Sequence, residues 1–301
     1  MTSAASSTIT TLPNTLRHRL LTWWMVMRIA LEERLAYRGD FALGTLMRFL
    51  PIITQIFLWG AVFSSIDSAA SASSSESPSV ENAKLGGYSF QDMVAYFLLT
   101  MLARAFSSMP GLASSIASQI RQGEIKRYLI QPVDLIGFLL LGRVAHKLAY
   151  YFVAAVPFAL VFFLCRGYFT DGFPPLDVFA AFIASLVMGF LLGFFLEASI
   201  GMIGFWFLEV SSLLFIFMLF SFFLSGHMFP LSLLPDSVLA IVNFLPFKYL
   251  AYFPSAIFLE KIPKDELMFE LAIEAAWVIF FIVACRMMYA RGVRRYSGFG
   301  G

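Results

Sequence analysis

The stretch RQGEIKRYLIQPVD, residues 121–134, is the most polar run between two long apolar blocks of the chain. Gly123 can adopt the positive φ that ends a helix, and Pro132 disfavours helical geometry at Gln131 before a new helix begins. The charged side chains of this stretch cannot lie in hydrocarbon without a large free-energy cost. The sequence therefore predicts a double turn that lies in water or against another protein, between two membrane segments.

The composition on either side of this stretch is that of a membrane protein. The chain of 301 residues is 59% hydrophobic and 13% charged, whereas a soluble domain is about 45–50% apolar and about 25% charged. Blocks of about 20 apolar residues are long enough to cross the hydrocarbon as helices, and the period-2 alternation of a membrane β-barrel is absent. The sequence predicts an all-α membrane protein with six transmembrane helices. The expected spans are 41–65, 90–109, 144–165, 177–196, 204–224 and 271–288.

The distribution of Lys and Arg predicts the orientation, because short cytoplasmic loops keep these residues. The N-terminal arm, the loop between the second and third spans and the C-terminal tail together carry 14 of them, whereas the loops on the other side carry 5. We therefore expect a multi-pass protein of the bacterial inner membrane with both termini in the cytoplasm.

The N-terminal arm has apolar residues at helical spacing between positions 14 and 40, but charged residues interrupt every window long enough to span. This pattern favours an amphipathic helix in the headgroup plane over a span. Such a helix either only anchors the chain or also couples it to a partner. The expected parts are a cytoplasmic arm over 1–40, a six-span domain over 41–290 with a coupling loop at 110–143 and an outer hairpin at 226–260, and a cytoplasmic tail over 291–301.

The segment 225–258 contains four prolines and is nevertheless apolar. The prolines exclude one continuous spanning helix, and the hydrophobicity argues against a free aqueous loop. We expect two short helices, at about 235–244 and 247–259, that dip into the outer leaflet and return. The residues expected to form an outer gate are Phe229, Pro230, Pro235, Phe244, Pro246 and Phe247.

Among the ionisable residues within the expected spans, Arg48, Arg104 and Glu209 are the candidates for a functional site. Intramembrane charges are costly and often functional. All three are expected in the cytoplasmic third of the membrane. They either reach the interface or form a structural Arg–Glu pair, or they act in a substrate gate.

The hairpin and the polar stretch together resemble a known family. The most specific residues of the hairpin are Gly226, Phe229, Pro230, Leu231, Leu234, Pro235, Leu245, Pro246 and Tyr249, and those of the polar stretch are Gly123, Leu129 and Pro132. Over nearly its whole length the chain resembles the membrane subunit of a type-2 ATP-binding-cassette (ABC) exporter. This resemblance implies an N-terminal elbow helix, a coupling helix and a re-entrant hairpin.

The resemblance also implies partners. A separate cytoplasmic ABC ATPase would dock on the coupling loop, and two six-span subunits, identical or similar, would form the transport path. The residues expected to contact the ATPase are Arg121, Gly123, Glu124, Lys126, Arg127, Gln131, Pro132 and Asp134.

The chain contains no GxxxxGK[ST] phosphate-binding loop,. We therefore expect no enzyme activity, no cofactor and no metal in this chain, with ATP and Mg²⁺ bound by the partner ATPase, and no nucleic-acid partner. The three histidines lie in separate segments, which argues against a membrane enzyme,. A secondary transporter and a non-transporting scaffold subunit stay open as alternatives, although the sequence shows no internal repeat and no carboxylate expected at mid-depth.

Aromatic and aliphatic side chains dominate the expected fifth span and the hairpin. A small ion would lose its hydration shell along such a path without replacement ligands. The composition therefore favours an amphipathic or hydrophobic substrate.

Overall fold

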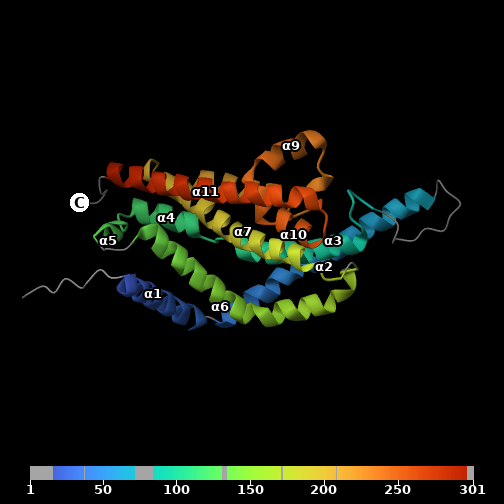
Figure 1. Cartoon of the computed structure of the whole chain (residues 1–301), viewed down its shortest axis with the longest axis horizontal. Helices are drawn as coiled ribbons and strands as arrows, with labels where there is room; N and C mark the ends of the chain where they lie inside the picture. Colours follow the sequence, from blue (N-terminus) through green and yellow to red (C-terminus); the bar gives the residue numbers. More distant parts are fainter. Residues whose placement is uncertain are drawn as a thin grey trace, which may run out of the picture.

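The computed structural model describes residues 16–36, 38–71, 84–130, 134–170, 172–207 and 209–296. Within these ranges the chain is helical and contains no strand, as the sequence predicts. Most of the helices run along the long axis of the molecule (Figure 1). The all-α prediction is confirmed.

Five helical segments of the described chain are long and apolar enough to cross a membrane. They are α2 (Arg38–Ser71), α3 with α4 (Phe90–Ser107 and Leu112–Arg121), α6 (Leu135–Leu164), α7 (Leu176–Met202) and α11 (Lys264–Arg295). A further apolar helix, α8 (Ser211–Leu224), has 14 residues. Since about 20 residues are needed to cross the hydrocarbon, α8 is too short to span it alone.

The junction before α8 differs from the expected one. The sequence places the end of one span near residue 196 and the start of the next at residue 204, whereas α7 continues to Met202 and is extended by the 3₁₀ helix η2 (Ile203–Phe205). η2 packs closely against two helices at glycines, which have no Cβ atom. A Cβ atom added to Gly204 would lie only 3.2 Å from Ala117 Cα of α4. A Cβ atom added to Gly292 of α11 would lie 2.3 Å from the Phe205 ring, so η2 is held between α4 and α11.

Helices α3 and α4 are separated at Ser108–Gly111. From the sequence alone, the Pro110–Gly111 pair predicts a kink at this point, near the end of the second expected span,. Gly111 has φ +73°, a conformation that favours glycine,. The expected interruption is therefore present.

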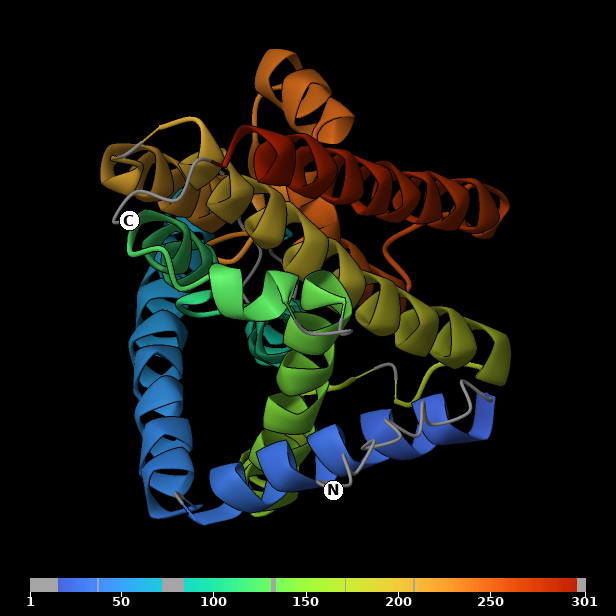
Figure 2. The same ribbon diagram turned by 90° about the vertical axis from the view of Figure 1, so that its left-hand side faces the viewer.

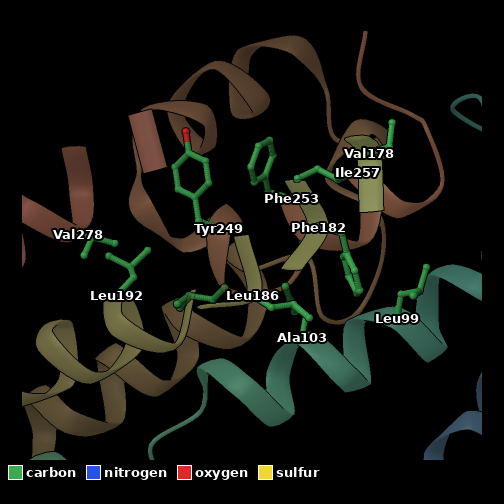
Figure 3. Close-up of a cluster of buried hydrophobic side chains, with 12 residues drawn as sticks. Leu99, Ala103, Val178, Phe182, Leu186, Leu192, Tyr249, Phe253, Ile257 and Val278 are labelled. Atoms are coloured by element: carbon green, nitrogen blue, oxygen red, sulfur yellow. The ribbon is translucent and has the colours of Figure 1, made fainter. Parts of the chain in front are cut away.

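Helix α7 is central, because it contacts α3, α4, α11 and α10 (Tyr252–Phe258). Figure 3 shows buried side chains of these helices meeting in one cluster, including Leu99, Phe182, Phe253 and Val278. At Gly193 of α7 the backbone of α3 comes so close that a Cβ atom would lie 2.0 Å from the Ser107 carbonyl oxygen.

The Pro-rich segment forms α9 (Asp236–Phe244), η4 (Pro246–Leu250) and α10 after a short 3₁₀ turn, η3 (Leu231–Leu233). These elements agree with the two short helices that the sequence predicts. α10 is buried between α3 and α7, whereas α9 projects beyond α11 (Figure 2).

A glycine turn ties this segment to α3. Gly226 has φ +76°, the Tyr96 hydroxyl donates to its carbonyl oxygen, and the Tyr252 amide donates to the Ser225 carbonyl oxygen over 2.9 Å. A side chain at Gly226 would clash with Tyr252, which explains in physical terms why the Ser–Gly pair stands there.

Helix α1 (Leu16–Ala36) packs along α6. The start of α1, the short helix α5 (Lys126–Leu129) and the end of α11 lie at one end of the molecule (Figure 1). The turn that starts at Arg166 (η1, Arg166–Tyr168) and helix α10 lie away from that end.

Candidate functional site

A cavity of about 810 Å³ lies between α2, the α3–α4 segment and α8. The residues that α8 contributes are spaced at helical intervals along one face. The apolar lining comprises Met47, Ile52, Phe97, Met101, Leu214, Phe217, Met218 and Phe222. This volume lies within the range of about 300–1,000 Å³ for small-molecule sites.

One part of the cavity wall is polar, at the break between α3 and α4. Arg104, Ser108, Ser114 and Glu197 line it there. Arg104 lies in the last turn of α3, and Glu197 projects from α7. The cavity therefore combines apolar walls with a charged end.

Charged groups from two neighbouring helices hold this break. Lys147 of α6 is buried and donates to the carbonyl oxygens of Ala105 and, over 2.7 Å, of Ser108. Arg143 donates to the Pro110 carbonyl oxygen over 3.0 Å, and Glu197 accepts from the Met109 amide over 3.3 Å. These bonds satisfy backbone groups that the end of a helix leaves without intrahelical partners.

A second hollow of about 390 Å³ adjoins the first, since Ser114 and Leu214 line both. Its wall carries further serines of α4, and Arg121 forms an ion pair with Glu209 at 3.6 Å that joins α4 to the start of α8. Hydrogen bonds from the Ser211 hydroxyl and amide hold the pKa of Glu209 below its usual value. The pair is therefore charged at neutral pH, and it is lost only as the pH falls through this lowered pKa.

The polar stretch forms an exposed surface at α5. Gly123 has φ +78° and ends the helix before it, as the sequence predicts. Ile125 is buried in the core and anchors the turn, whereas Ile130 is 85% exposed beside Lys126 and Arg127. We call the exposed residues Glu124, Lys126, Arg127, Leu129 and Ile130 the α5 surface.

A model of the ABC-2 family of transporter proteins matches residues 79–300. The chain belongs to the ABC-2 family. No curated protein matches the sequence. As an ABC-2 family protein the chain is a multi-pass membrane protein and a permease of an ABC transporter, so the recognised resemblance is confirmed.

The described residues of the predicted coupling set have different contacts within the chain, and their contact with an ATPase stays a prediction. Asp134 caps α6 by accepting from the Gly137 amide at 2.8 Å, and it also pairs with Arg286 of α11 at 2.6 Å. Glu124 and Arg127 pair with each other at 3.8 Å on the exposed α5 surface. Gln131 and Pro132 lie outside the described residues.

The predicted intramembrane charges have different positions. Arg104 lines the cavity, and the side chain of Arg48 lies outside the described side chains. The expectation that Glu209 lies within a span is corrected, because Glu209 precedes α8 in an exposed turn. The Arg–Glu pair that it forms is with Arg121.

Sequence reasoning missed two carboxylates within the long helices. Glu197 was expected in a loop because it interrupts the hydropathy of α7, although the helical spacing of apolar residues continues through it. Glu274 lies within α11, is fully buried, and has the Ser185 hydroxyl as a polar neighbour. Burial inside the protein does not give a depth in the membrane, so the expectation of no carboxylate at mid-depth stays a prediction.

The residues expected at the outer gate do not form one cluster. Phe247 packs against Phe217 of the cavity wall, with ring centroids 6.1 Å apart. Phe244 is 78% exposed on α9, and Pro235 is exposed as well, whereas Pro230 and Pro246 are buried and Phe229 is half-buried. Their role in gating stays a prediction.

Proposed function

We propose that this chain is half of an ATP-driven exporter of the bacterial inner membrane that carries an amphipathic or hydrophobic substrate through the cavity. The single observation that carries the proposal is that α4 forms part of the cavity wall at one end and leads into the α5 surface at the other. A partner that moves the α5 surface therefore moves the cavity wall.

The packing of α4 supports this coupling. A Cβ atom at Gly201 of α7 would lie 2.8 Å from the Ala113 carbonyl oxygen of α4, so the two helices are in close backbone contact. By contrast, α8 buries only Ser221 among its residues. In our proposal α4 and α7 move as one unit, and the cavity opens or closes against α2 and α8.

The α5 surface has the chemistry of a protein contact. An exposed isoleucine and leucine lie beside charges of both signs, and interfaces combine an apolar centre with a polar rim. The proposed partner is a cytoplasmic ABC ATPase that binds ATP and Mg²⁺, because this sequence has no phosphate-binding loop.

The proposal includes the finer topology. α1 acts as the elbow helix, and α8 with the chain next to it crosses the membrane as one of six spans. The segment from Gly226 to Phe258 forms the re-entrant hairpin before the last span, and both termini are cytoplasmic. Cysteine labelling checks the orientation. In intact cells a membrane-impermeant maleimide is expected to label Ser232→Cys and not Glu124→Cys, and the reverse pattern would contradict the orientation.

The transport proposal is tested with proteoliposomes that contain the chain and its co-purified ATPase. We expect ATP-dependent export that Arg127→Glu and Ile130→Asp reduce by at least tenfold while both variants insert normally, because broken interface contacts commonly cost about 2–5 kcal/mol. Arg166→Glu is the matched control, since Arg166 lies in the turn after α6. Transport without ATP, or full export by both variants, would overturn the proposal.

A further inference from the structure

The cavity has two chemically different parts, and this division constrains what it binds. Apolar side chains of α2, α3 and α8 line most of it, and the charged Arg104 and Glu197 line it at the α3–α4 break. The uncharged polar side chains of Gln55 and Ser221, together with His227, line it elsewhere. A uniformly polar solute, such as a sugar, would leave the aromatic and methionine side chains in contact with polar groups or water. A purely apolar solute would leave Arg104 and Glu197 without water. A molecule with a polar head and an apolar chain matches both parts.

The polar part carries an excess of positive charge. Arg104, Arg143 and Lys147 all lie close enough to Glu197 to interact with it electrostatically. Lys147 and Arg143 are bound to backbone carbonyls at the break, so their charges are fixed in place behind the wall. Three cations around one carboxylate leave a net positive field at this end of the cavity.

The start of α4 adds to this field. α4 begins after Gly111 with no side chain capping its first turn, and Gly111, Ala113 and Ser114 all line the cavity. The N-terminal end of a helix carries a partial positive charge. A cationic head would meet Glu197 here but also this surplus of positive charge.

We propose that the polar end of the cavity binds the anionic head group of an amphiphile, such as a phosphate or carboxylate, with Arg104 as the recognising side chain. The proposal rests on the proposed function for the cavity and adds the charge of the substrate. Arg104 is suited to this role because its planar guanidinium binds two oxygens of one head group. Glu197 disfavours unselective anion binding and positions Met109 at the break.

The test measures binding without ATP, on the purified transporter in zwitterionic nanodiscs with empty nanodiscs as the blank. The probes share one chain length and differ in the head: decyl phosphate, decanoate, decyltrimethylammonium and decanol, with inorganic phosphate as the head alone. We expect decyl phosphate and decanoate to bind at least tenfold more tightly than decyltrimethylammonium. Inorganic phosphate is expected to bind at least tenfold more weakly than decyl phosphate.

Variants connect the preference to the site. Arg104→Gln is expected to weaken decyl phosphate binding at least tenfold and to leave decanol binding unchanged, whereas Glu197→Gln is expected to strengthen decyl phosphate binding severalfold. Arg166→Gln makes the same change of charge outside the cavity. It is expected to leave the binding of both decyl phosphate and decanol unchanged. If Arg104→Gln does not fold, the test rests on Glu197→Gln. Stronger binding of decyl phosphate then supports the proposal, and unchanged or weaker binding contradicts it.

Several outcomes would overturn the proposal: preference for the cationic probe, equal binding of inorganic phosphate, no saturable binding of any probe, or equal effects of Arg104→Gln and Arg166→Gln. These outcomes leave ATP-dependent export intact. Loss of the proposed function would appear separately, as absence of ATP-driven transport in proteoliposomes.

Discussion

Gly193 determines how closely α3 approaches α7. A Cβ atom there would lie 2.0 Å from the Ser107 carbonyl oxygen, and the Ser107 hydroxyl donates to Leu250 over 2.7 Å. Gly193→Ala is therefore expected to destabilise the protein by about 1–3 kcal/mol through overpacking. Thermal unfolding in detergent, followed by size-exclusion chromatography, measures the effect as a lower melting temperature.

Gly142 of α6 provides the matched control, because nothing lies within 4 Å of a Cβ atom built there. Gly142→Ala is expected to stabilise by about 0.4–1 kcal/mol, since it restricts the unfolded chain without a clash. If the two alanine variants melted at the same temperature, the close contact between α3 and α7 would not exist.

Two glutamates one helical turn apart in α11 are expected to respond oppositely to removal. Glu270 pairs with the 6% exposed Lys248 at 2.9 Å and accepts from the Tyr249 hydroxyl at 2.8 Å. Glu270→Leu leaves that lysine buried and unpaired, which costs about 3–5 kcal/mol. Glu274→Leu removes a buried carboxylate that forms no ion pair among the described residues, and it is expected to be neutral or stabilising,.

The melting temperatures of the two leucine variants, measured side by side in detergent, check this contrast. A large loss of stability in Glu274→Leu would show that this carboxylate has a compensating partner.

These two glutamates also show what cannot be predicted from single residues of the sequence. Glu270 and Glu274 lie at the start of an apolar run, and nothing in the spacing tells a buried acid from one at the interface.

At the level of helices, an exposed ion pair between Arg121 and Glu209 joins α4 to the turn before α8, beside the second hollow. Such pairs contribute only about 0–1 kcal/mol to stability, so their removal is expected to change access rather than folding. In inverted vesicles, Arg121→Glu is expected to speed maleimide labelling of Ser118→Cys severalfold. The double exchange Arg121→Glu with Glu209→Arg restores the wild-type rate.

Equal labelling rates in the single and double variants would mean that the pair does not control entry to the hollow. A melting temperature within a few degrees of the wild type is the control for folding. Lower pH slows maleimide labelling of every thiol, so the measured quantity is the ratio of the labelling rates with and without Arg121→Glu. Because the pKa of Glu209 is lowered, this ratio is expected to stay constant from neutral pH down to the pH at which this carboxylate is protonated.

The helices themselves were largely predictable, because long apolar blocks and Pro–Gly pairs are strong local signals. The break at Pro110 and Gly111, the turn at Gly226 and the start of α9 near Pro235 all occur where the sequence indicates. The length of α7 was not predictable from hydropathy. It depends on contacts of Gly201 and Gly204 with α4, which join segments far apart in the chain.

The cavity was not predictable either, because its walls come from segments separated by more than a hundred residues. Arg104 was selected as an intramembrane charge, but its proximity to Glu197 and to Lys147 is set by the packing of α3, α6 and α7. Sequence reasoning identified the residue type and missed its neighbours.

For the whole molecule, the remaining question is what closes the cavity between α2 and α8. The apolar α8 buries one residue, Ser221, and exposes most of its phenylalanines. Lipid alone would cover this face equally well, but a path for a charged head group needs protein on all sides. We therefore expect a second permease subunit to pack against α8.

Cysteine crosslinking in native membranes tests this arrangement in a background of Cys165→Ala and Cys285→Ala. Phe220→Cys on α8, where the phenylalanine is 53% exposed, is expected to give a crosslinked species of twice the subunit mass. Phe152→Cys on α6, where it is 79% exposed, is expected to stay monomeric because α6 lies away from α8. Co-expression of two differently tagged copies distinguishes a homodimer, which carries both tags, from a heterodimer, which carries one. If Phe220→Cys stayed monomeric and Phe152→Cys gave the crosslinked dimer, the subunit interface would lie at α6 and not at α8. The cavity would then be open to lipid.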